Sequence, residues 1–333
     1  MIDLHLHLDG SLNPKNILTM AKKSGVEFPY TDENVIRSKM AVEPSCTNLG
    51  EYLEKFDLPL MLLQTRECIE YAVYELIRDL KEQGLCYAEI RYAPQLHLQK
   101  GLTQTKVVEA AIEGRNRGMK DFGMNINFIL CCMRGNHNHA ENIETVMAAE
   151  KFLGKGVCAV DLAGNEAAYP TENFKDIFDL AKRKNIPAVI HAGEAAGADS
   201  IYNALKMGAV RIGHGIHAID DEALMCELKE KNIYLEMCYS SNLQTGTVSK
   251  AQDYPLKKFI DYGISVTLNT DNLTVSGTDL RKEYNLVKKQ FSLSDDMLKA
   301  IALNSADAAF LNAEEKKNLK EYIDKEFIKW LYR

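Results

Sequence analysis

The stretch IDLHLHLDG, residues 2–10, is the most informative part of this chain. Leucines at positions 4, 6 and 8 alternate with His5 and His7. Because successive side chains of a strand point to opposite faces, the two imidazoles share one face and the leucines share the other. The stretch therefore predicts a strand on which two histidines can reach one metal ion, although a strand with two polar residues facing water fits the same pattern.

Seven further apolar runs follow, and each ends in a polar or glycine-containing signature. Together with the first they give eight candidate strands, at 2–8, 85–92, 126–133, 157–162, 188–191, 210–213, 233–238 and 264–269. Segments with helical periodicity lie between them, at 67–83, 171–184, 220–231 and 255–262. Strands that alternate with helices pair in parallel through right-handed crossovers. Eight such units predict an α/β fold, a closed (β/α)8 TIM barrel, with an open doubly wound sheet as the alternative.

The connection after the first strand is far longer than a barrel loop needs, because it extends from Asp9 to Gly84. Residues 49–63 within it are apolar at helical spacing. We expect a long helical insertion that packs around the barrel, covers its mouth as a lid, or does both. The last segment, 313–333, is charged and helical in character, with large apolar side chains that would dock it. Residues 1–333 are expected to form a single barrel domain.

Composition narrows the class of protein and its partners. The chain has 333 residues, of which 46% are hydrophobic and 26% charged, and its formal net charge is −7. This charge argues against a nucleic acid or an anionic membrane as the main partner. No apolar run approaches the roughly 18 residues that cross a bilayer, and polar residues interrupt the place where a signal peptide would be apolar. The eight cysteines contain no CxxC pair and no secreted-type framework, so we expect a cytoplasmic protein.

Histidines and carboxylates gather at the expected carboxyl ends of the strands, where a parallel barrel has its site. They are His5, His7, His191, Glu194, His214 and Asp271. Imidazole and carboxylate suit zinc or a similar divalent ion. His5, His7, His191 and Asp271 would give four protein ligands, and one water would make the site five-coordinate. A bound metal lowers the pKa of that water toward about 7, which supplies hydroxide at neutral pH.

Two of these residues are expected beside the metal rather than on it. Glu194 follows His191 by three residues, and its carboxyl can deliver a proton if burial raises its pKa. His214 ends another strand and can hold the hydroxide or stabilise charge. The fourth strand contains Asp161 but no lysine of the kind that bridges two metals in dinuclear barrels, so a single metal ion per chain is favoured. On the second strand Glu89 and Arg91 alternate, and we expect them to form ion pairs inside the barrel or at its rim.

With these residues in view, the chain resembles the adenosine and AMP deaminase family, and within it the adenosine deaminases. The resemblance runs in order through HLHLDGS at 5–11, EYLEKFDLP at 51–59, EIRYAP at 89–94, DLAGNE at 161–166, HAGE at 191–194, RIGHG at 211–215 and LNTDN at 268–272. It implies a zinc-dependent (β/α)8 barrel of the amidohydrolase superfamily. Such an enzyme hydrolyses the exocyclic amine of adenosine, or deoxyadenosine, to give inosine, or deoxyinosine, and ammonia in purine salvage.

The resemblance also implies roles for matching positions. One Zn²⁺ per chain would be held by His5, His7, His191 and Asp271. Glu194 would protonate ring nitrogen 1, and His214 would orient the hydroxide that attacks carbon 6. The small-molecule purine nucleoside would be bound by the Gly164 backbone at ring nitrogen 3, by Asp9 at the ribose with His7 lining the same pocket, and by Asn272 at ring nitrogen 7.

One position departs from the family pattern. Many members have two acidic residues in a row where this chain has Asp271 and Asn272. Ring nitrogen 7 is an acceptor, so a carboxyl group must be protonated to donate to it, whereas an amide donates as it stands. The change is compatible with purine binding, and it leaves deamination of another aminopurine, such as adenine or a modified adenosine, as the alternative.

Other functions fit the sequence less well. AMP is disfavoured because Asp9 near the 5′ position would repel a phosphate and no Arg/Lys cluster accompanies the motifs. A non-catalytic nucleoside-binding protein would be expected to have a damaged ligand set, and a metal-dependent phosphoesterase would need a second metal and basic phosphate contacts.

Overall fold

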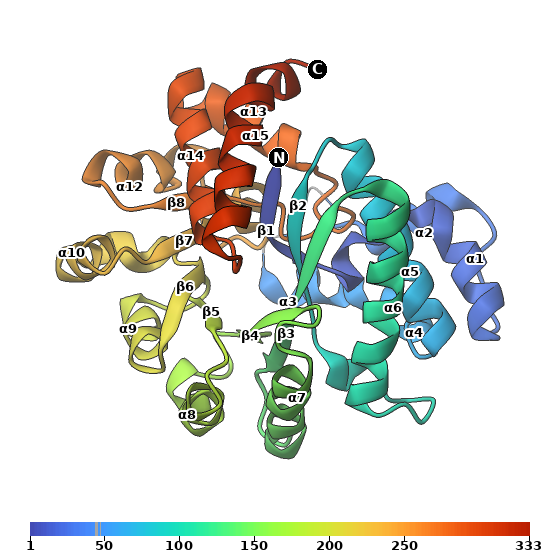
Figure 1. Ribbon diagram of the computed structural model, residues 1–333. Helices are drawn as coiled ribbons and strands as arrows, with labels where there is room; N and C mark the ends of the chain where they lie inside the picture. Colours follow the sequence, from blue (N-terminus) through green and yellow to red (C-terminus); the bar gives the residue numbers. More distant parts are fainter. Residues whose placement is uncertain (44–45, 47) are drawn as a thin grey trace.

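Eight parallel strands form the centre of the molecule and follow one another around it in chain order (Figure 1). The computed structural model describes residues 1–43, 46 and 48–333. The strands are β1 (Ile2–His7), β2 (Tyr87–Tyr92), β3 (Asn125–Met133), β4 (Val157–Ala163), β5 (Ala188–Ala192), β6 (Ala209–His214), β7 (Tyr234–Met237) and β8 (Val266–Leu268). All eight predicted strands are present, with ends displaced by a few residues at most.

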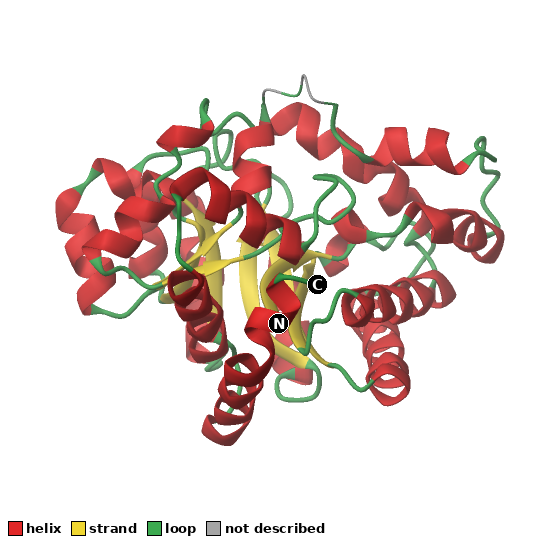
Figure 2. Ribbon diagram, turned by 90° about the horizontal axis from the view of Figure 1, so that it is seen from above, coloured by secondary structure: helices red, strands yellow, loops and turns green. Residues whose placement is uncertain are grey.

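Helices lie around the ring of strands (Figure 1), and in the view from above helices lie on both sides of the strands (Figure 2). The α-helices are α1 (Pro14–Ser24), α2 (Glu33–Met40), α3 (Leu49–Leu53), α4 (Asp57–Leu62), α5 (Arg66–Glu82), α6 (Gln104–Phe122), α7 (His139–Phe152), α8 (Lys175–Arg183), α9 (Ala198–Lys206), α10 (Glu222–Glu230), α11 (Tyr239–Gln244), α12 (Leu256–Tyr262), α13 (Leu280–Phe291), α14 (Asp295–Ala308) and α15 (Ala313–Leu331). Short 3-10 helices are η1 (Asp9–Ser11), η2 (Glu54–Phe56), η3 (Pro94–Leu96), η4 (Thr171–Phe174), η5 (Ile216–Asp220) and η6 (Ala251–Asp253). The barrel prediction and the long helical insertion after the first strand are both confirmed.

The barrel is nearly closed, and Asp271 makes the contact between its last and first strands. Its backbone N–H donates to the His5 carbonyl at 2.8 Å, and its carbonyl accepts from the His7 N–H at 2.7 Å. A parallel bridge joins Leu6 to Asp271 just beyond the end of β8. The Asp271 backbone, together with side-chain hydrogen bonds of Asn269 and Thr270 to β1, therefore joins the two strands, and Asp271 is also a predicted metal ligand.

The two faces of the strands have different chemistry. The apolar side chains of β1, such as Leu4 and Leu6, are fully buried in the large hydrophobic cluster that includes residues of the surrounding helices. The interior carries charged groups, and ion pairs join Arg91 to Asp161 and Glu236 at 2.9 and 2.8 Å. Arg211 pairs with Glu89 at 2.6 Å and with Glu236 at 2.7 Å. The ion pairs predicted for Glu89 and Arg91 therefore lie inside the barrel.

The helical layer contains one close approach, between α5 and α6. Gly114 of α6 faces α5 so closely that a Cβ there would collide with the Glu70 carbonyl oxygen. One turn further along, a Cβ at Gly118 would lie 2.8 Å from Ile77 Cδ1. Glycine at these positions lets the two helix backbones approach each other.

Both chain termini are held by the same turn between α5 and β2. The Met1 ammonium donates to the Gly84 carbonyl at 2.8 Å, and the Trp330 indole N–H of α15 donates to the Gln83 carbonyl at 2.9 Å. Trp330 is 5% exposed and Phe327 is fully buried, so the last segment docks as predicted.

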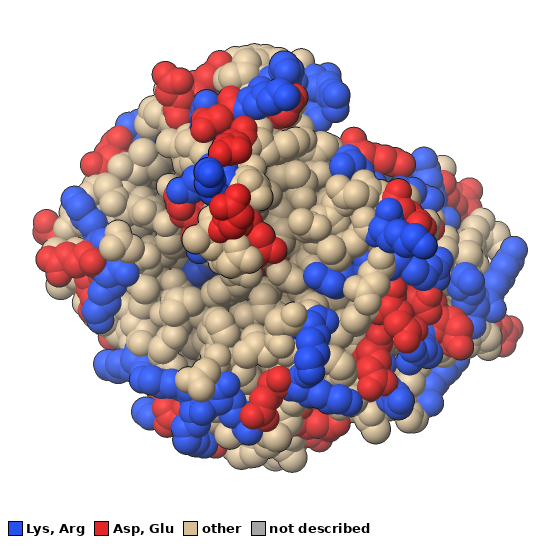
Figure 3. Space-filling view, in the orientation of Figure 1, with Lys and Arg blue, Asp and Glu red and all other residues tan. Residues whose placement is uncertain are grey.

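The surface offers no single patch of one charge on the face seen in Figure 3. Acidic and basic side chains are interspersed around its edge, and its centre is mostly uncharged. Among the described residues, no helix combines the length and the apolar character that crossing a lipid bilayer requires.

Candidate metal and substrate site

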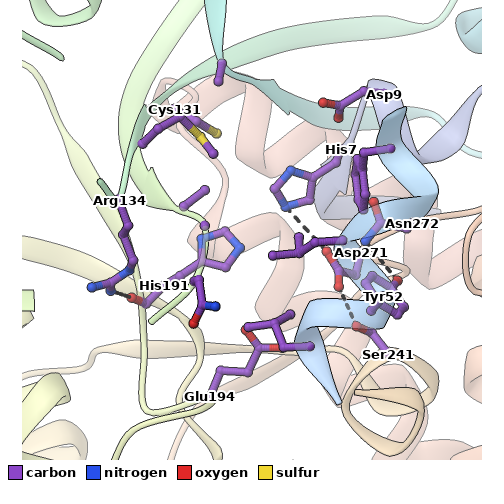
Figure 4. A pocket seen from close by; sticks show the side chains of 18 of the residues that line it. His7, Asp9, Tyr52, Cys131, Arg134, His191, Glu194, Ser241, Asp271 and Asn272 are labelled. Atoms are coloured by element: carbon purple, nitrogen blue, oxygen red, sulfur yellow. Dashed lines mark hydrogen bonds and ion pairs between the residues drawn. The ribbon is translucent and has the colours of Figure 1, made fainter. Parts of the chain in front are cut away.

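A cavity of about 320 Å³ lies at the carboxyl ends of the strands and contains most of the predicted site residues. Those that line it are His7, Asp9, Gly164, His191, Glu194, His214, Asp271 and Asn272. Figure 4 shows His7 and His191 from different parts of the chain facing this space, with Glu194 and Asp271 beside them. His5 is fully buried, with its ring centroid 4.9 Å from that of His214. The fold therefore brings every predicted site residue to one end of the barrel.

Three histidines and one aspartate form a buried cluster suited to a metal ion. His5, His191, His214 and Asp271 each offer a ligand atom, and these atoms lie within 4.8 Å of one another. His7 belongs to the same cluster, because its Nε2 lies 3.4 Å from Asp271 Oδ1, compared with 3.5 Å for His5 Nε2. Its ring centroid is 5.4 Å from that of His191. Four imidazoles thus surround one carboxylate, and distance alone does not distinguish ligands from neighbours.

Contacts at the far ring nitrogens indicate which imidazoles present a lone pair to the cluster. His5 Nδ1 is hydrogen-bonded to Glu236 Oε2 at 2.8 Å, and His191 Nδ1 lies within ion-pair distance of Asp161 Oδ2, at 2.8 Å. Because an ionised carboxylate only accepts, Nδ1 carries the proton in both rings and Nε2 is left with its lone pair. His5 Nε2 is buried and has no hydrogen-bond partner among the described residues. In this tautomer both rings are compatible with metal binding through Nε2.

His214 has the opposite arrangement. Its Nδ1 lies 3.0 Å from Nδ2 of Asn242, whose Oδ1 accepts from the Tyr254 hydroxyl at 3.3 Å. The amide nitrogen is the donor, so Nδ1 of the neutral ring accepts and Nε2 carries the hydrogen. That Nε2 lies 3.6 Å from Glu194 Oε2. In this tautomer His214 presents a hydrogen-bond donor to the cavity.

Arginines keep the two carboxylates behind the cluster ionised. Burial alone would raise the pKa of Glu236, but Arg91 and Arg211 outweigh burial and hold it well below its ordinary value. Burial also raises the pKa of Asp161, but His191 and Arg91 outweigh this effect and hold that pKa well below its usual range. Arg91 contacts both carboxylates, so it links the supports of His5 and His191.

Asp271 is placed by its backbone and by one neighbour. Its φ is +59°, a left-handed value that is uncommon for residues other than glycine. The two backbone hydrogen bonds to β1 hold it there, and the Ser241 hydroxyl donates to Oδ2 at 2.6 Å. His214 has a similar φ of +61°. Backbone strain of this kind persists where surrounding contacts fix it, and it is frequent at functional sites.

Glu194 is 5% exposed and belongs to the loop that follows β5. Burial raises the pKa of its carboxyl, Asp271 adds to this effect, and His214 opposes it. The environment therefore shifts this carboxyl toward its protonated form, which can donate a proton. This is the condition that sequence reasoning set for an acid at this position.

Glu166 supports that loop and was not singled out from the sequence. Its carboxylate accepts from four successive backbone N–H groups, those of residues 193–196, at 2.7, 2.9, 2.7 and 3.1 Å, and also from the Ser200 hydroxyl. It is 2% exposed. The only signal for it in the sequence was its place as the last residue of DLAGNE. Ser241 and Asn242, also missed, stand in the polar signature after the seventh predicted strand.

The residues expected to bind substrate form the wall of the cavity. Asp9 is 6% exposed, its Oδ1 has no partner within the described chain, and burial raises its pKa to about 6. Gly164 has a φ of +104°, which a residue with a side chain rarely adopts. Asn272 Oδ1 is likewise buried without a hydrogen-bond partner in the described part of the structure. An unpartnered oxygen beside a cavity, such as that of Asp9, is a group that a polar ligand would satisfy, whereas Asn272 Oδ1 faces Gly10.

The insertion after β1 supplies the apolar side of the cavity. We call residues 48–62, which contain α3, η2 and α4, the cover. Cavity-lining residues of the cover are Leu49, Tyr52, Leu53, Phe56 and Leu60. Leu62 is fully buried in the hydrophobic core. The two roles expected for the insertion, packing and covering the barrel mouth, are therefore combined in one segment.

Comparisons with known proteins agree with this geometry. A family model described as adenosine deaminase matches residues 1–326. The chain is 47% identical over 331 residues to the adenosine deaminase of Haemophilus ducreyi, covering 98% of this chain and 96% of that protein. It is 40% identical over 328 residues to the adenosine deaminase of Enterococcus faecalis, with coverage of 98% and 96%.

Solved structures share the fold. Adenine deaminase from Arthrobacter aurescens aligns with a TM-score of 0.88 at 25% identity, covering 98% of both chains. The N6-methyl-AMP deaminase from Arabidopsis thaliana aligns with a TM-score of 0.85 at 24% identity, covering 98% of this chain and 97% of that one. The second likeness shows the fold alone.

Proposed function

The chain belongs to the adenosine deaminase family, and from this premise we propose that its cavity binds one zinc ion and uses it to convert adenosine and deoxyadenosine to inosine and deoxyinosine. Water adds at carbon 6 of the purine, the bond from carbon 6 to the amino nitrogen breaks, and ammonia leaves. The family assignment makes the protein a hydrolase, an adenosine deaminase. The roles of individual residues and the identity of the metal are our proposal.

The donor set fits zinc. Imidazole nitrogens with one carboxylate oxygen are ligands that zinc prefers, and the cluster is buried. We assign His5, His7, His191 and Asp271 as the ligands, although the tightest group of ligand atoms contains His214 in place of His7. The assignment follows the proton on His214 Nε2, which leaves that nitrogen no lone pair to give. When bound, zinc would supply a strong nucleophile from water at neutral pH.

Glu194 donates a proton in the proposed reaction, and His214 orients the attacking oxygen. Protonated Glu194 donates to ring nitrogen 1, which gains charge when carbon 6 is attacked. The N–H of His214 Nε2 donates to the attacking oxygen and directs it toward carbon 6. The 3.6 Å between His214 Nε2 and Glu194 Oε2 places both groups on the same side of the cavity. One donor thus serves the nucleophile and the other serves the ring.

The cavity wall orients the nucleoside. The Gly164 N–H donates to ring nitrogen 3, the Asn272 amide donates to ring nitrogen 7, and Asp9 accepts from a ribose hydroxyl, with His7 lining the same pocket. The unpartnered oxygen of Asp9 is the support for a ribose contact. Near neutral pH a pKa of about 6 leaves Asp9 mostly ionised, and its charge would repel a 5′-phosphate.

A single observation carries the proposal. Side chains from β1, from the ends of β5 and β6, and from the segment after β8 form one buried cluster of three histidines and an aspartate, of which we assign all but His214 to the metal, and a carboxyl with a raised pKa lies beside it. With a metal ion bound, this combination would supply a nucleophile and an acid at one cavity of about 320 Å³.

A second candidate is deamination of another aminopurine, adenine or a modified adenosine. The Arthrobacter aurescens structure, at 25% identity, is an adenine deaminase, so this base is within reach of a closely similar barrel. Adenine would leave the buried carboxylate of Asp9 without its ribose partner, which disfavours it here.

A substrate panel separates these candidates. We expect the fall in ultraviolet absorbance on deamination to be fastest for adenosine, clear for deoxyadenosine, and slow for adenine and AMP. Asp9→Ala should lower kcat/KM for adenosine by about tenfold or more, the cost of leaving substrate and protein groups unpaired, and should leave the rate with adenine nearly unchanged. Faster turnover of adenine or AMP than of adenosine by the unaltered enzyme would overturn our choice of substrate.

A further inference from the structure

The phenol of Tyr52 connects the cover to the cavity wall beside Asp271. Tyr52 lies in α3 and is 2% exposed. Its Oη lies 3.0 Å from Asn272 Nδ2 and 2.7 Å from Ser276 Oγ. Figure 4 shows Tyr52, Asn272, Asp271 and Ser241 together on one side of the cavity. One hydroxyl of the insertion therefore reaches the residue that departs from the family pattern.

Both partners of Tyr52 belong to a single turn after β8. The Ser276 N–H donates to the Asn272 carbonyl at 3.1 Å, which places Ser276 one turn beyond Asn272. Gln244 of α11 donates to the Ser276 carbonyl at 3.0 Å and holds the turn from the other side. The phenol thus contacts two fixed points of a turn whose own backbone is hydrogen-bonded.

The contact with Tyr52 gives the Asn272 amide a direction. Nδ2 donates to Oη, so the amide nitrogen faces the phenol, while Oδ1 faces Gly10, where a Cβ would collide with it. A side-chain amide can turn by 180° and exchange oxygen and nitrogen with almost no change of shape. Tyr52 has one hydroxyl hydrogen, and when Ser276 accepts that hydrogen the phenol oxygen can only accept from Asn272. The turned amide would then lose its partner.

We propose that Tyr52 is a positioning residue that holds the Asn272 amide with its nitrogen toward the purine, and that this selects bases with a hydrogen-bond acceptor at ring position 7. The inference rests on the proposed function, which places Asn272 at ring nitrogen 7. One hydrogen of Nδ2 goes to Tyr52, and the second has no acceptor in the described part of the chain. A ring nitrogen accepts that hydrogen, whereas a C–H at the same position offers no lone pair.

The choice of base thereby depends on the insertion. Tyr52 reaches Asn272 only while α3 lies over the cavity, in the position that Leu49 and Leu53 share as lining residues. A cover residue with no contact to substrate in our assignment then affects which ring is accepted, while the apolar cover residues affect all rings alike.

Two ribosides without a 6-amino group test the proposal, because neither can be deaminated. The inhibition constants of purine riboside and 7-deazapurine riboside are measured against adenosine with the zinc-loaded enzyme. We expect the unaltered enzyme to prefer purine riboside. Tyr52→Phe should reduce that preference about three- to tenfold, the effect of one hydrogen bond, because it removes the hydroxyl and keeps the ring.

Further variants separate positioning from packing. Asn272→Ala should abolish the preference, and Tyr52→Phe in that background should change it no further, since Tyr52 acts through Asn272. Leu53→Ala, on the same helix, should weaken both ribosides equally and leave their ratio intact. Ser276→Ala, which frees the phenol hydrogen for a turned amide, should reduce the preference less than Tyr52→Phe and decides the matter if that variant does not fold.

The outcomes for Tyr52 and for the enzyme's function are distinguishable. An unchanged riboside ratio in Tyr52→Phe, with adenosine still deaminated, overturns the role of Tyr52 and leaves the proposed function intact. An unaltered, zinc-loaded enzyme that does not deaminate adenosine overturns both.

Discussion

At the scale of single residues, the state of Glu194 depends on what surrounds its carboxyl. Burial is the largest influence and raises its pKa, and the nearby Asp271 acts in the same direction. Asn242 Nδ2 lies 3.5 Å from Oε1, so few strong donors stabilise the charged form. Glu166 fixes the backbone below it through the N–H groups of residues 193–196. A carboxyl that is buried, held and weakly solvated is suited to act as an acid near neutral pH.

Glu194→Gln tests that role. Glutamine keeps the shape and can donate a hydrogen bond, but it cannot give up a proton, so kcat for adenosine should fall by about 10²–10⁴-fold. The metal content by elemental analysis should stay at one per chain, because we assign Glu194 no place among the ligands. Glu172→Gln, the same change at an exposed glutamate, is the control and should have unaltered kcat. Turnover at the normal rate in Glu194→Gln would remove Glu194 from the mechanism.

At the scale of elements, the segments that follow the strands make structural hydrogen bonds and also position the side chains of the site. Beyond the end of β8, the Asp271 backbone is hydrogen-bonded to β1. The hydrogen bonds that close the barrel therefore also orient the Asp271 side chain. In α11, Ser241 binds the Asp271 carboxylate and Asn242 sets the proton on His214. The short helix α11 thus orients the Asp271 carboxylate and sets the tautomer of His214.

The contact of α5 with α6 allows a prediction at this scale. Gly114→Ala forces a methyl group against the Glu70 carbonyl, which is backbone and cannot move alone, so the helices must separate. We expect a loss of about 1–3 kcal/mol of stability, seen as a fall in Tm of several degrees. Gly118→Ala should cost less, because the Ile77 side chain that it meets can shift.

Differential scanning calorimetry of both variants measures this difference. Adenosine turnover at low temperature should be unaffected in either, since neither glycine lines the cavity. Equal Tm values for Gly114→Ala and the unaltered protein would show that the helices do not pack as closely as described.

At the scale of the whole molecule, the metal cluster joins parts of the chain that are far apart in sequence. His5 and His7 belong to β1, His191 to β5, and Asp271 follows β8. Behind them Arg91 on β2 pairs with carboxylates on β4 and β7, so most of the barrel contributes to one network. A bound ion would therefore stabilise the barrel as a unit as well as serve the reaction.

Removal of the metal should lower the thermal stability of the entire protein. Where free metal exceeds its Kd about a thousandfold, binding adds about 4 kcal/mol, so chelation should lower Tm by on the order of 10 °C. Activity should disappear with the metal and return when zinc is added back. Asp271→Ala is the matched control, because its Tm should not respond to the chelator. A Tm of the unaltered protein that is insensitive to chelation would contradict a metal that joins these strands.

Much of the fold and of the site could be predicted from the sequence, because the signals are local. Alternation of Leu4, His5, Leu6 and His7 reports a strand, and polar signatures after apolar runs report strand ends. In a parallel barrel all strand ends of one kind meet, so local signals were enough to name the cluster. The specific roles of these residues, from the ligand set to Asn272 at ring nitrogen 7, stay predictions until variants are measured.

Three features became visible only in the tertiary structure: the contacts that set the histidine tautomers, the backbone support of the site residues, and the position of the cover. Which nitrogen of His5, His191 or His214 carries hydrogen depends on Glu236, Asp161 and Asn242, which are 231, 30 and 28 residues distant in the chain. Tyr52 meets Asn272 across 220 residues. No periodicity encodes such pairs, because a hydrogen bond depends on positions in space that are set by packing of the complete barrel. The types of chemical group at the strand ends could be read from the sequence, whereas the folded chain brought these groups to one cavity and set their hydrogen-bond partners, and which of them bind a metal ion stays a prediction.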